Sequence, residues 1–366
     1  MSTEKPAPKK SAPRKAATRP AAAKKAAPGA RAAAGAATAA NEENLAPVAT
    51  QKSHRPLAVV AFGGNALLRP EDDGTVAEQL RRSEGAAVWL ADFARRGYDL
   101  VCVHGNGPQV GQVLIQMEEA AAKVPPGTVD FAVAETEGGM GYLLELAIRN
   151  RLASQHIKRQ VATVLTLVTV NRDDPAFRAP SKPIGPFFAR HRALELQRRL
   201  RWKMVEDSGR GWRKVVPSPR PLEIENVAAV RNLLDHGHLV IAGGGGGIPV
   251  VRKGSGRLVG VEAVIDKDRT SALLARELKA DLFILLTGVP QVVKNFGRKD
   301  QEPLPILPLS EARRLLDKGQ FPAGSMGPKI ESAIDFVAAT GRPALITNIE
   351  HLEAALEGES GTRIVP

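Results

Sequence analysis

Lysine and aspartate side chains next to glycine-rich turns are the residues of this 366-residue chain whose types suggest chemistry. Two aspartates flank Lys267 in the run 266–268, Lys329 ends the segment Gly-Ser-Met-Gly-Pro-Lys, and Lys182 precedes a proline. Transfer of a phosphoryl group through a loose transition state needs positioning and cationic stabilisation more than covalent chemistry. Two or three lysines, an aspartate that orients them, Mg²⁺ and backbone N–H groups would suffice for such a reaction.

Each of these residues also has a plain structural interpretation. At the start of a predicted helix, Asp268 can cap the helix and Lys267 can extend into solvent, while Lys182 and Lys329 can be ordinary surface cations. No Ser-His-Asp grouping or nucleophile elbow competes with the phosphoryl-transfer hypothesis. That hypothesis therefore depends on what brings the lysines together.

Glycine-rich turns follow three apolar runs that are typical of buried parallel strands. The run 57–62 ends at Gly63, Gly64 and Asn65, the run 99–104 ends at Gly105 and Asn106, and the run 239–242 continues into the five glycines 243–247. Their backbone N–H groups can bind anionic oxygens. Because ligands of open α/β sheets bind beyond the carboxyl ends of strands, we expect one site for a phosphate-bearing ligand. None of the turns matches the Walker-type phosphate loop.

Strands, glycine turns and helices alternate from about residue 56 onward, which predicts a mainly parallel sheet with helices on both faces. The expected helices are 76–96, 110–123, 131–153 (broken by small residues), 223–236, 269–279, 309–319 and 330–340. Further strands are expected at 160–170 in the centre of the sheet, at 281–286 and, as the last strand, at 344–347. Basic, Gly/Pro-rich residues from 172 to about 220 interrupt the alternation and predict an inserted lid subdomain.

The composition is that of a chain with a full hydrophobic core, since 43% of its residues are apolar. The single cysteine, Cys102, lies inside a predicted strand and is expected to be a buried thiol. One cysteine excludes an intramolecular disulfide, and no cluster has zinc-ligand spacing, which favours a reducing, cytoplasmic setting. No uncharged apolar stretch approaches the ~18 residues that a membrane span needs.

Residues 1–54 are rich in Ala, Lys and Pro, and we expect them to form a disordered basic tail. Of the net charge of +12, residues 1–40 contribute +8 from nine Lys or Arg and one Glu. Such a tail could bind nucleic acid weakly through phosphates, with a strong salt dependence. An inert extension is the alternative, and a transit peptide ranks last because the prolines disfavour a long amphipathic helix.

From about residue 56 to its end, the chain resembles bacterial carbamate kinases, members of the amino-acid kinase superfamily. The similar motifs occur in family order at 61–66, 104–111, 160–166, 182–187, 209–219, 243–250, 260–268, 286–289 and 324–329. The resemblance implies one domain over 55–366, a three-layer α/β/α sandwich with a mainly parallel sheet, and a lid near 172–220. It also implies a homodimer that transfers a phosphoryl group reversibly between ATP and carbamate with Mg²⁺. In arginine catabolism, enzymes of this family typically catalyse the reaction in the direction that forms ATP.

The resemblance also implies roles for individual residues. Gly63, Gly64 and Asn65 correspond to contacts with the transferred phosphoryl group, and Gly105 and Asn106 to the carbamate site. The catalytic positions are Lys267 and Lys329, which neutralise the phosphates, Asp268, which organises them, and Lys182 on the lid. The positions implied for nucleotide binding are Gly244, Gly245, Gly246, Thr287, Gly288 and again Lys329. Carbamate is already an anion, so no general base is required.

One departure from the family pattern is Glu137, because Thr136-Glu137-Gly138 stands where the family more often has Thr-Gln-Gly. This leaves the polar contact of that helix open. An acetylglutamate kinase is the first alternative, but those enzymes commonly have Lys where this chain has Asn65 and lack the lid motif at Lys182. A non-catalytic nucleotide sensor is the second, against which the complete lysine set argues. A nucleic-acid-binding protein, the third, rests on the tail alone.

Overall fold

The computed structural model describes residues 55–366 except 64–71, 73, 208 and 323, so the tail, Gly64 and Asn65 lie outside the described residues. An eight-stranded sheet has the order β15-β17-β16-β12-β1-β2-β9-β3. Its strands are β1 (Leu57–Phe62), β2 (Asp99–His104), β3 (Val161–Val164), β9 (Leu239–Ala242), β12 (Leu282–Leu286), β15 (Ile306–Pro308), β16 (Ala344–Thr347) and β17 (Thr362–Val365). Every neighbouring pair is parallel except β16 and β17, which confirms the predicted mainly parallel sheet.

Side chains of the central strands are buried on both faces of this sheet. In β1, Val59 and Ala61 belong to one hydrophobic core, whereas Ala58 and Val60 belong to the other, and all four are fully buried. Successive residues of a strand point to opposite faces. The continuous apolar run in the sequence therefore requires a layer of helices on each side.

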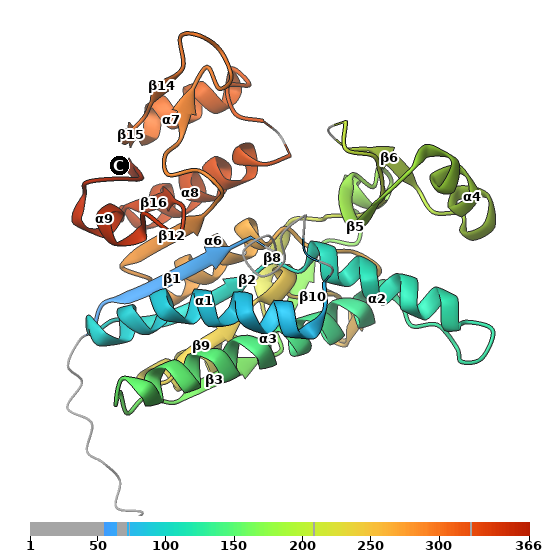
Figure 1. The fold of residues 1–366 in the computed structure, drawn as a ribbon, viewed down its shortest axis with the longest axis horizontal. Helices are drawn as coiled ribbons and strands as arrows, with labels where there is room; N and C mark the ends of the chain where they lie inside the picture. Colours follow the sequence, from blue (N-terminus) through green and yellow to red (C-terminus); the bar gives the residue numbers. More distant parts are fainter. Residues whose placement is uncertain (1–54, 64–71, 73, 208, 323) are drawn as a thin grey trace, which may run out of the picture. The chain divides into compact units, whose positions relative to one another are not determined.

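Two layers of helices supply this cover. One face packs against α1 (Val76–Arg95), α3 (Val129–Ser154) and α9 (Leu352–Glu357). The other packs against α5 (Val227–Asp235), α6 (Lys267–Leu278), α7 (Leu309–Asp317) and α8 (Met326–Thr340). Figure 1 shows α1 and α3 on one side of β1, and α6 and α8 on the other. The three-layer α/β/α sandwich is thereby confirmed.

The stretch 160–170 is two strands in two sheets, so the prediction of one central strand is wrong. β3 lies at an edge of the main sheet, while β4 (Leu167–Val170) joins a second sheet of order β11-β10-β4-β8. Between them the Thr166 hydroxyl donates to the Val164 carbonyl (2.8 Å) and accepts from the N–H of Gly243 (2.7 Å), where the chain leaves the main sheet. The other strands of the second sheet are β8 (Pro221–Ile224), β10 (Ile248–Arg252) and β11 (Leu258–Gly260).

Three further element predictions are corrected. The helix expected from 223 begins only at Val227, because residues before it pair with β4 as β8. The helix expected to be broken at 131–153 is continuous from 129 to 154. Its glycines serve close packing, since a Cβ on Gly141 would lie 2.3 Å from a methyl of Thr163. The strand at 344–347 is not the last, because β17 follows and pairs antiparallel with it.

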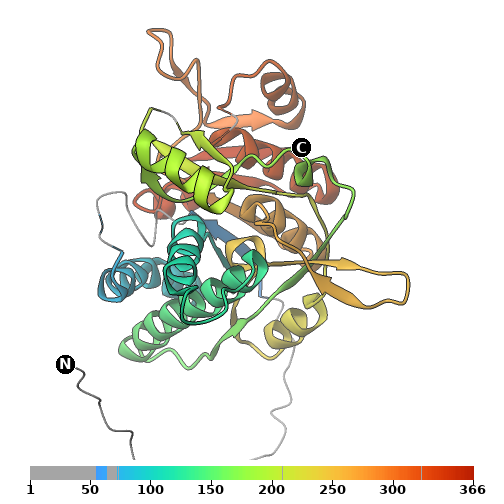
Figure 2. The same cartoon turned by 90° about the vertical axis from the view of Figure 1, so that its right-hand side faces the viewer.

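Residues 182–216 form a small antiparallel unit inside the segment 172–220. It contains β5 (Lys182–Phe188), α4 (Arg190–Leu200), β6 (Met204–Glu206) and β7 (Trp212–Val216), in the sheet order β5-β7-β6. Figures 1 and 2 show this green unit standing off the main sheet next to α2 (Gly107–Ala120). A Cβ on Gly111 of α2 would lie 1.9 Å from the Cα of Gly185, so β5 rests on the backbone of α2. Whether the unit closes as a lid stays a prediction.

Smaller elements complete the described chain: a 3-10 turn at Pro175–Phe177, and a hairpin of β13 (Val293–Lys294) and β14 (Glu302–Pro303). Cys102 is buried in β2, and burial raises the pKa of its thiol. Across the described residues, no helix is both long and apolar enough to span a bilayer.

Candidate active site

The glycine-rich positions singled out in the sequence lie at one edge of the main sheet. The four adjacent strands β12, β1, β2 and β9 are parallel, so their carboxyl ends meet there. Gly63 follows β1, Gly105 and Asn106 follow β2, and Thr287 and Gly288 follow β12. The edge therefore has the placement at which open α/β sheets bind ligands.

The glycine turn, Gly243–Gly247 after β9, is built for close packing. The φ angles of Gly243 and Gly245 are 65° and 68°, a region that favours glycine. A Cβ on Gly245 would lie 2.1 Å from the side-chain nitrogen of Asn106. Four of the five N–H groups bond to protein acceptors: those of residues 243, 244, 246 and 247. The turn thus contributes shape to the site rather than the row of N–H donors that the sequence suggested.

Three lysines converge on two aspartates at the start of α6, and we call this set the lysine cluster (Lys182, Lys267, Lys329, Asp266 and Asp268). The Nζ of Lys267 lies 2.5 Å from one oxygen of Asp268, and the Nζ of Lys329 lies 2.9 Å from the other. Lys329 stands in the first turn of α8, which packs against α6. The residues 266–268 and 329 thus meet although 61 positions separate Lys329 from Asp268.

Lys182 reaches this cluster from the first residue of β5. Its ammonium donates to Oδ2 of Asp266 (3.2 Å) and to the carbonyl of Ile265 (3.1 Å). Asp266 is also the N-cap of α6, accepting from the N–H of Asp268 (2.9 Å). The capping residue is therefore Asp266 and not Asp268, and Lys267 is 8% exposed rather than solvated.

The charges of the cluster perturb one another strongly. Burial opposes ionisation of Asp266, but the three neighbouring lysines outweigh it and lower the pKa of that carboxyl. Burial also opposes ionisation of Asp268, but Lys267 and Lys329 outweigh it and lower the pKa of that carboxyl as well. Burial lowers the pKa of Lys267 to about 8, whereas attraction to Asp268 overcomes burial and raises the pKa of Lys329. Both aspartates are consequently ionised, and the cluster carries three cationic groups against two anionic ones.

Two helices also begin at the cluster. α6 starts at Lys267 and α8 at Met326, so both present the positive ends of their dipoles to the same place. Together with the excess ammonium charge, this makes the position favourable for a bound anion such as a phosphate. The Thr270 hydroxyl of α6 donates to the Gly246 carbonyl (2.8 Å), which ties α6 to the glycine turn.

The remaining predicted positions differ in what they offer a ligand. Asn106 is buried and donates from Nδ2 to the hydroxyl of Thr136 (2.9 Å), which leaves its Oδ1 available. The N–H of Gly105 donates to the carbonyl of Phe62 (3.0 Å), and the N–H of Thr287 donates to the carbonyl of Thr347 (2.8 Å). Both N–H groups are therefore already used within the protein. Gly63 is half-buried and Gly288 is exposed. Gly64 and Asn65 lie outside the described residues.

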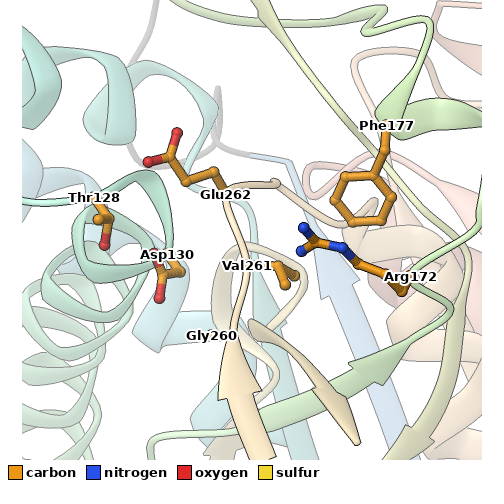
Figure 3. A pocket seen from close by; sticks show the side chains of 7 residues that line it. All are labelled: Thr128, Asp130, Arg172, Phe177, Gly260, Val261 and Glu262. Atoms are coloured by element: carbon orange, nitrogen blue, oxygen red, sulfur yellow. The ribbon is translucent and has the colours of Figure 1, made fainter. Parts of the chain in front are cut away.

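A cavity of about 600 Å³ has walls formed by other residues (Figure 3). It is lined by Thr128, Asp130, Arg172, Phe177, Gly260, Val261 and Glu262. None of the sequence-predicted site residues lines it. Its walls mix one guanidinium with two carboxylates, in contrast to the lysine cluster.

Sequence reasoning missed three residues of this region. The sequence did not identify Asp266 as the ion-pair partner of Lys182. Its place directly before a helix is, however, a typical N-cap signal. Thr136 and Glu137 bond to Asn106 and to the N–H of Gly244, respectively. The sequence marked this pair only as a departure from the family's Thr-Gln-Gly, and nothing in it indicated which groups the two side chains bond to.

Comparison with known proteins agrees with the geometry. The model of the amino acid kinase family matches residues 56–348, so the chain belongs to the amino acid kinase family and is a kinase. Several similar relatives are carbamate kinases. The carbamate kinase of Thermococcus kodakarensis is 42% identical over 310 residues, 84% of this chain and 98% of the relative. Carbamate kinase 2 of Enterococcus faecalis is 44% identical over the same shares.

Among solved structures, carbamate kinases are similar to this chain as well. The carbamate kinase of Giardia lamblia bound to citric acid superposes with a TM-score of 0.82 at 38% identity, covering 85% of this chain and 99% of that one. The same enzyme bound to AMP-PNP gives a TM-score of 0.79 at 38% identity over equal shares.

Proposed function

We propose that this protein transfers a phosphoryl group reversibly between ATP and carbamate, giving ADP and carbamoyl phosphate. The observation that carries the proposal is the lysine cluster, in which three ammonium groups from three elements meet at two helix N-termini. The carbamate kinases to which the chain is similar support the identity of the acceptor. A nucleotide substrate is supported by the Giardia relative that was solved with AMP-PNP.

The chemistry follows from the charges of the cluster. In the loose transition state of phosphoryl transfer, negative charge spreads over the oxygens of the migrating group. Lys267 and Lys329, each held by one oxygen of Asp268, would exchange this carboxylate for phosphate oxygens. Their positions are set before the substrate binds, so little reorganisation is needed. Carbamate is an anion and attacks without loss of a proton, so no general base is required.

Lys182 gives the small unit a part in this reaction. It is the first residue of β5, and its contact with Asp266 connects the unit to α6. We propose that the unit acts as a lid whose movement brings the third ammonium group to the transferred phosphoryl group.

Magnesium is part of the proposed reaction, and its ligands follow from the donors at the site. All four carboxylate oxygens of Asp266 and Asp268 already accept from N–H groups. No group of three His, Cys, Asp or Glu side chains suited to a metal occurs within the described part of the chain. Mg²⁺ commonly binds through substrate phosphates and water. We therefore expect the nucleotide phosphates to hold the ion, which when bound neutralises part of their charge.

The physiological setting remains a prediction. Production of ATP in arginine catabolism and a homodimer are expected from the resemblance to carbamate kinases, and a cytoplasmic location is expected from the single cysteine. Weak contact of the tail with nucleic acid is expected from its charge alone.

A coupled assay of ATP formation from carbamoyl phosphate and ADP tests the proposal directly. We expect turnover that requires Mg²⁺ and exceeds the enzyme-free decay of fresh carbamoyl phosphate. N-acetylglutamate with ATP serves as the competing acceptor and is expected to give none. Inactivity with carbamoyl phosphate, or preference for acetylglutamate, would contradict the assignment.

A further inference from the structure

Asp266 uses its two carboxyl oxygens for two different elements. Oδ1 accepts from the N–H of Asp268 (2.9 Å) and thereby caps α6. Oδ2 accepts from the ammonium group of Lys182 (3.2 Å), which is the first residue of β5. One carboxylate thus holds the beginning of the helix and the beginning of the strand next to each other.

The contact lies at the base of the small antiparallel unit. Lys182 is paired with Val216, the last residue of β7. The residue after Val216 is Pro217, and its carbonyl accepts from the N–H of Val264 (2.9 Å). Both strands of the unit therefore meet the short segment that leads into Asp266. The position of Lys182 relative to α6 is set there.

The ammonium group of Lys182 has three N–H donors. The carbonyl of Ile265 takes one of them (3.1 Å), and Oδ2 of Asp266 takes the second. Among the described residues, no third acceptor bonds to this nitrogen. The side chains of Lys182 and Asp266 are 21% and 25% exposed, so the third donor is accessible to a ligand.

We propose that Asp266 is a positioning residue, which holds Lys182 so that its third N–H donates to an oxygen of the transferred phosphoryl group. This role rests on the proposed phosphoryl transfer and gives the two aspartates different parts. Asp268 yields its lysines to the phosphates, whereas Asp266 keeps Lys182 throughout the reaction. The carboxylate of Asp266 cannot turn away, because its Oδ1 is bonded to the backbone of α6. Lys182 is therefore oriented before the substrate binds.

A structural ion pair between the unit and α6 is the competing interpretation. Partly exposed ion pairs contribute little to stability, so this interpretation leaves the precise placement of Lys182 without a purpose. Burial opposes ionisation of Asp266, but Lys182, Lys267 and Lys329 outweigh it and lower the pKa of the carboxyl. The charge that holds Lys182 is thus permanent at the pH of any assay.

Chemical labelling of Lys182 tests the proposal without any turnover. Acetic anhydride acetylates accessible amino groups, and peptide mass spectrometry gives the rate at Lys182, with the exposed Lys253 as the internal reference. Asp266→Asn removes the charge that holds Lys182, while the amide oxygen can still cap α6. We expect Lys182 to be acetylated several times faster in this variant than in wild type. Equal rates would overturn the proposal.

Kinetics test whether Asp266 acts through Lys182. Asp266→Asn should lower kcat by about tenfold and change KM little, because the directed ammonium group acts on the transition state. In the Lys182→Met background, the same substitution should cost no more than about twofold. The coupled assay of ATP formation measures all four proteins of this double-mutant cycle. An equal loss in both backgrounds would show that Asp266 acts on other groups, and would overturn the proposal.

Two further variants separate the cap from the charge. Asp266→Ser can still cap α6, but its side chain is too short to reach Lys182. It should match Asp266→Asn in labelling and kcat, and it keeps the test available if the asparagine variant does not fold. Wild-type behaviour of a folded Asp266→Ser would overturn the proposal. Asp235→Asn, at an exposed position of α5, should leave both readouts unchanged.

The two readouts also separate this inference from the proposed reaction. If wild type does not turn over carbamoyl phosphate, the carbamate kinase assignment fails. The labelling rates still decide whether Asp266 holds Lys182, because they need no substrate.

Discussion

Asp268 is the residue that holds Lys267 and Lys329, because each of its oxygens binds one of them. A phosphate bound at the proposed site would offer the same lysines a second anion. The carboxylate thus keeps two like charges close together before the substrate arrives, which is the preorganisation that electrostatic catalysis needs.

Lys329→Ala should lower kcat by about 10²–10³, since one directed donor to a developing charge is worth about 2.7–4 kcal/mol. Folding should change little, because Asp268 keeps its bond to Lys267. The measurement is the coupled assay together with thermal unfolding. Lys253→Ala, in the exposed turn between β10 and β11, is the matched control. A near-normal kcat would remove Lys329 from the catalytic residues.

Asp268→Asn tests the charge of the cluster through pH. The pKa of Asp268 is lower in the folded protein than its ordinary value of 3.8, because, although burial opposes it, Lys267 and Lys329 favour the ionised carboxylate. Its stabilising contribution is therefore present above 3.8 and is lost as pH falls through the folded pKa. Denaturant unfolding should show a less stable variant at pH 7 and a shrinking difference below pH about 4. The exposed Asp235→Asn is the control, and an equal loss at every pH would point to a steric cause instead.

At the scale of elements, the site depends on how closely the glycine turn approaches α6. The turn touches the residues just before Asp266, and Thr270 holds it from the helix. The position of Lys267 and Asp268 is therefore set by backbone packing. A side chain at Gly246 would therefore displace Ile265, which directly precedes the N-cap Asp266.

Gly246→Ala should lower both the melting temperature and kcat. Gly246 has a φ of 100°, and an added Cβ would lie 2.4 Å from the carbonyl oxygen of Ile265. The strained conformation alone costs about 1–3 kcal/mol. Gly254→Ala, where no atom lies within 4 Å of the added Cβ, is the control for thermal unfolding and the coupled assay. Wild-type values for Gly246→Ala would show that the turn adapts freely.

At the scale of the whole molecule, the basic tail and the folded part are expected to act separately. Residues 1–40 carry most of the net charge, and every described site residue lies after position 54. The family match likewise begins at residue 56. Kinase activity should therefore not require the tail.

Deletion of residues 1–54 should leave kcat and KM unchanged and abolish retention on DNA. Binding of the full chain should fall steeply as salt rises, because the contacts are with phosphates. The measurements are the coupled assay and fluorescence anisotropy with labelled duplex at several salt concentrations. Equal retention of both chains would contradict the role of the tail.

The sequence alone determined the strands, most of the helices and the identity of the chemically able residues. The apolar run at 57–62 and the helix at 76–95 are encoded in neighbouring residues through hydrophobicity and period. The glycines that end β1, β2 and β9 are local signals too. These features, with the motif order, sufficed for the fold class and the family.

Only the tertiary structure decided which charges meet and which polar groups are buried. Lys182 and Asp266 are 84 residues apart, and no local pattern links them. The division of 160–170 between two sheets and the burial of Glu137 likewise depend on distant partners, Gly243 and Gly244. The hydrophobic pattern of a sequence reports on residues that are near one another in the chain. Desolvation and charge pairing, in contrast, arise from contacts between residues that are far apart in the sequence.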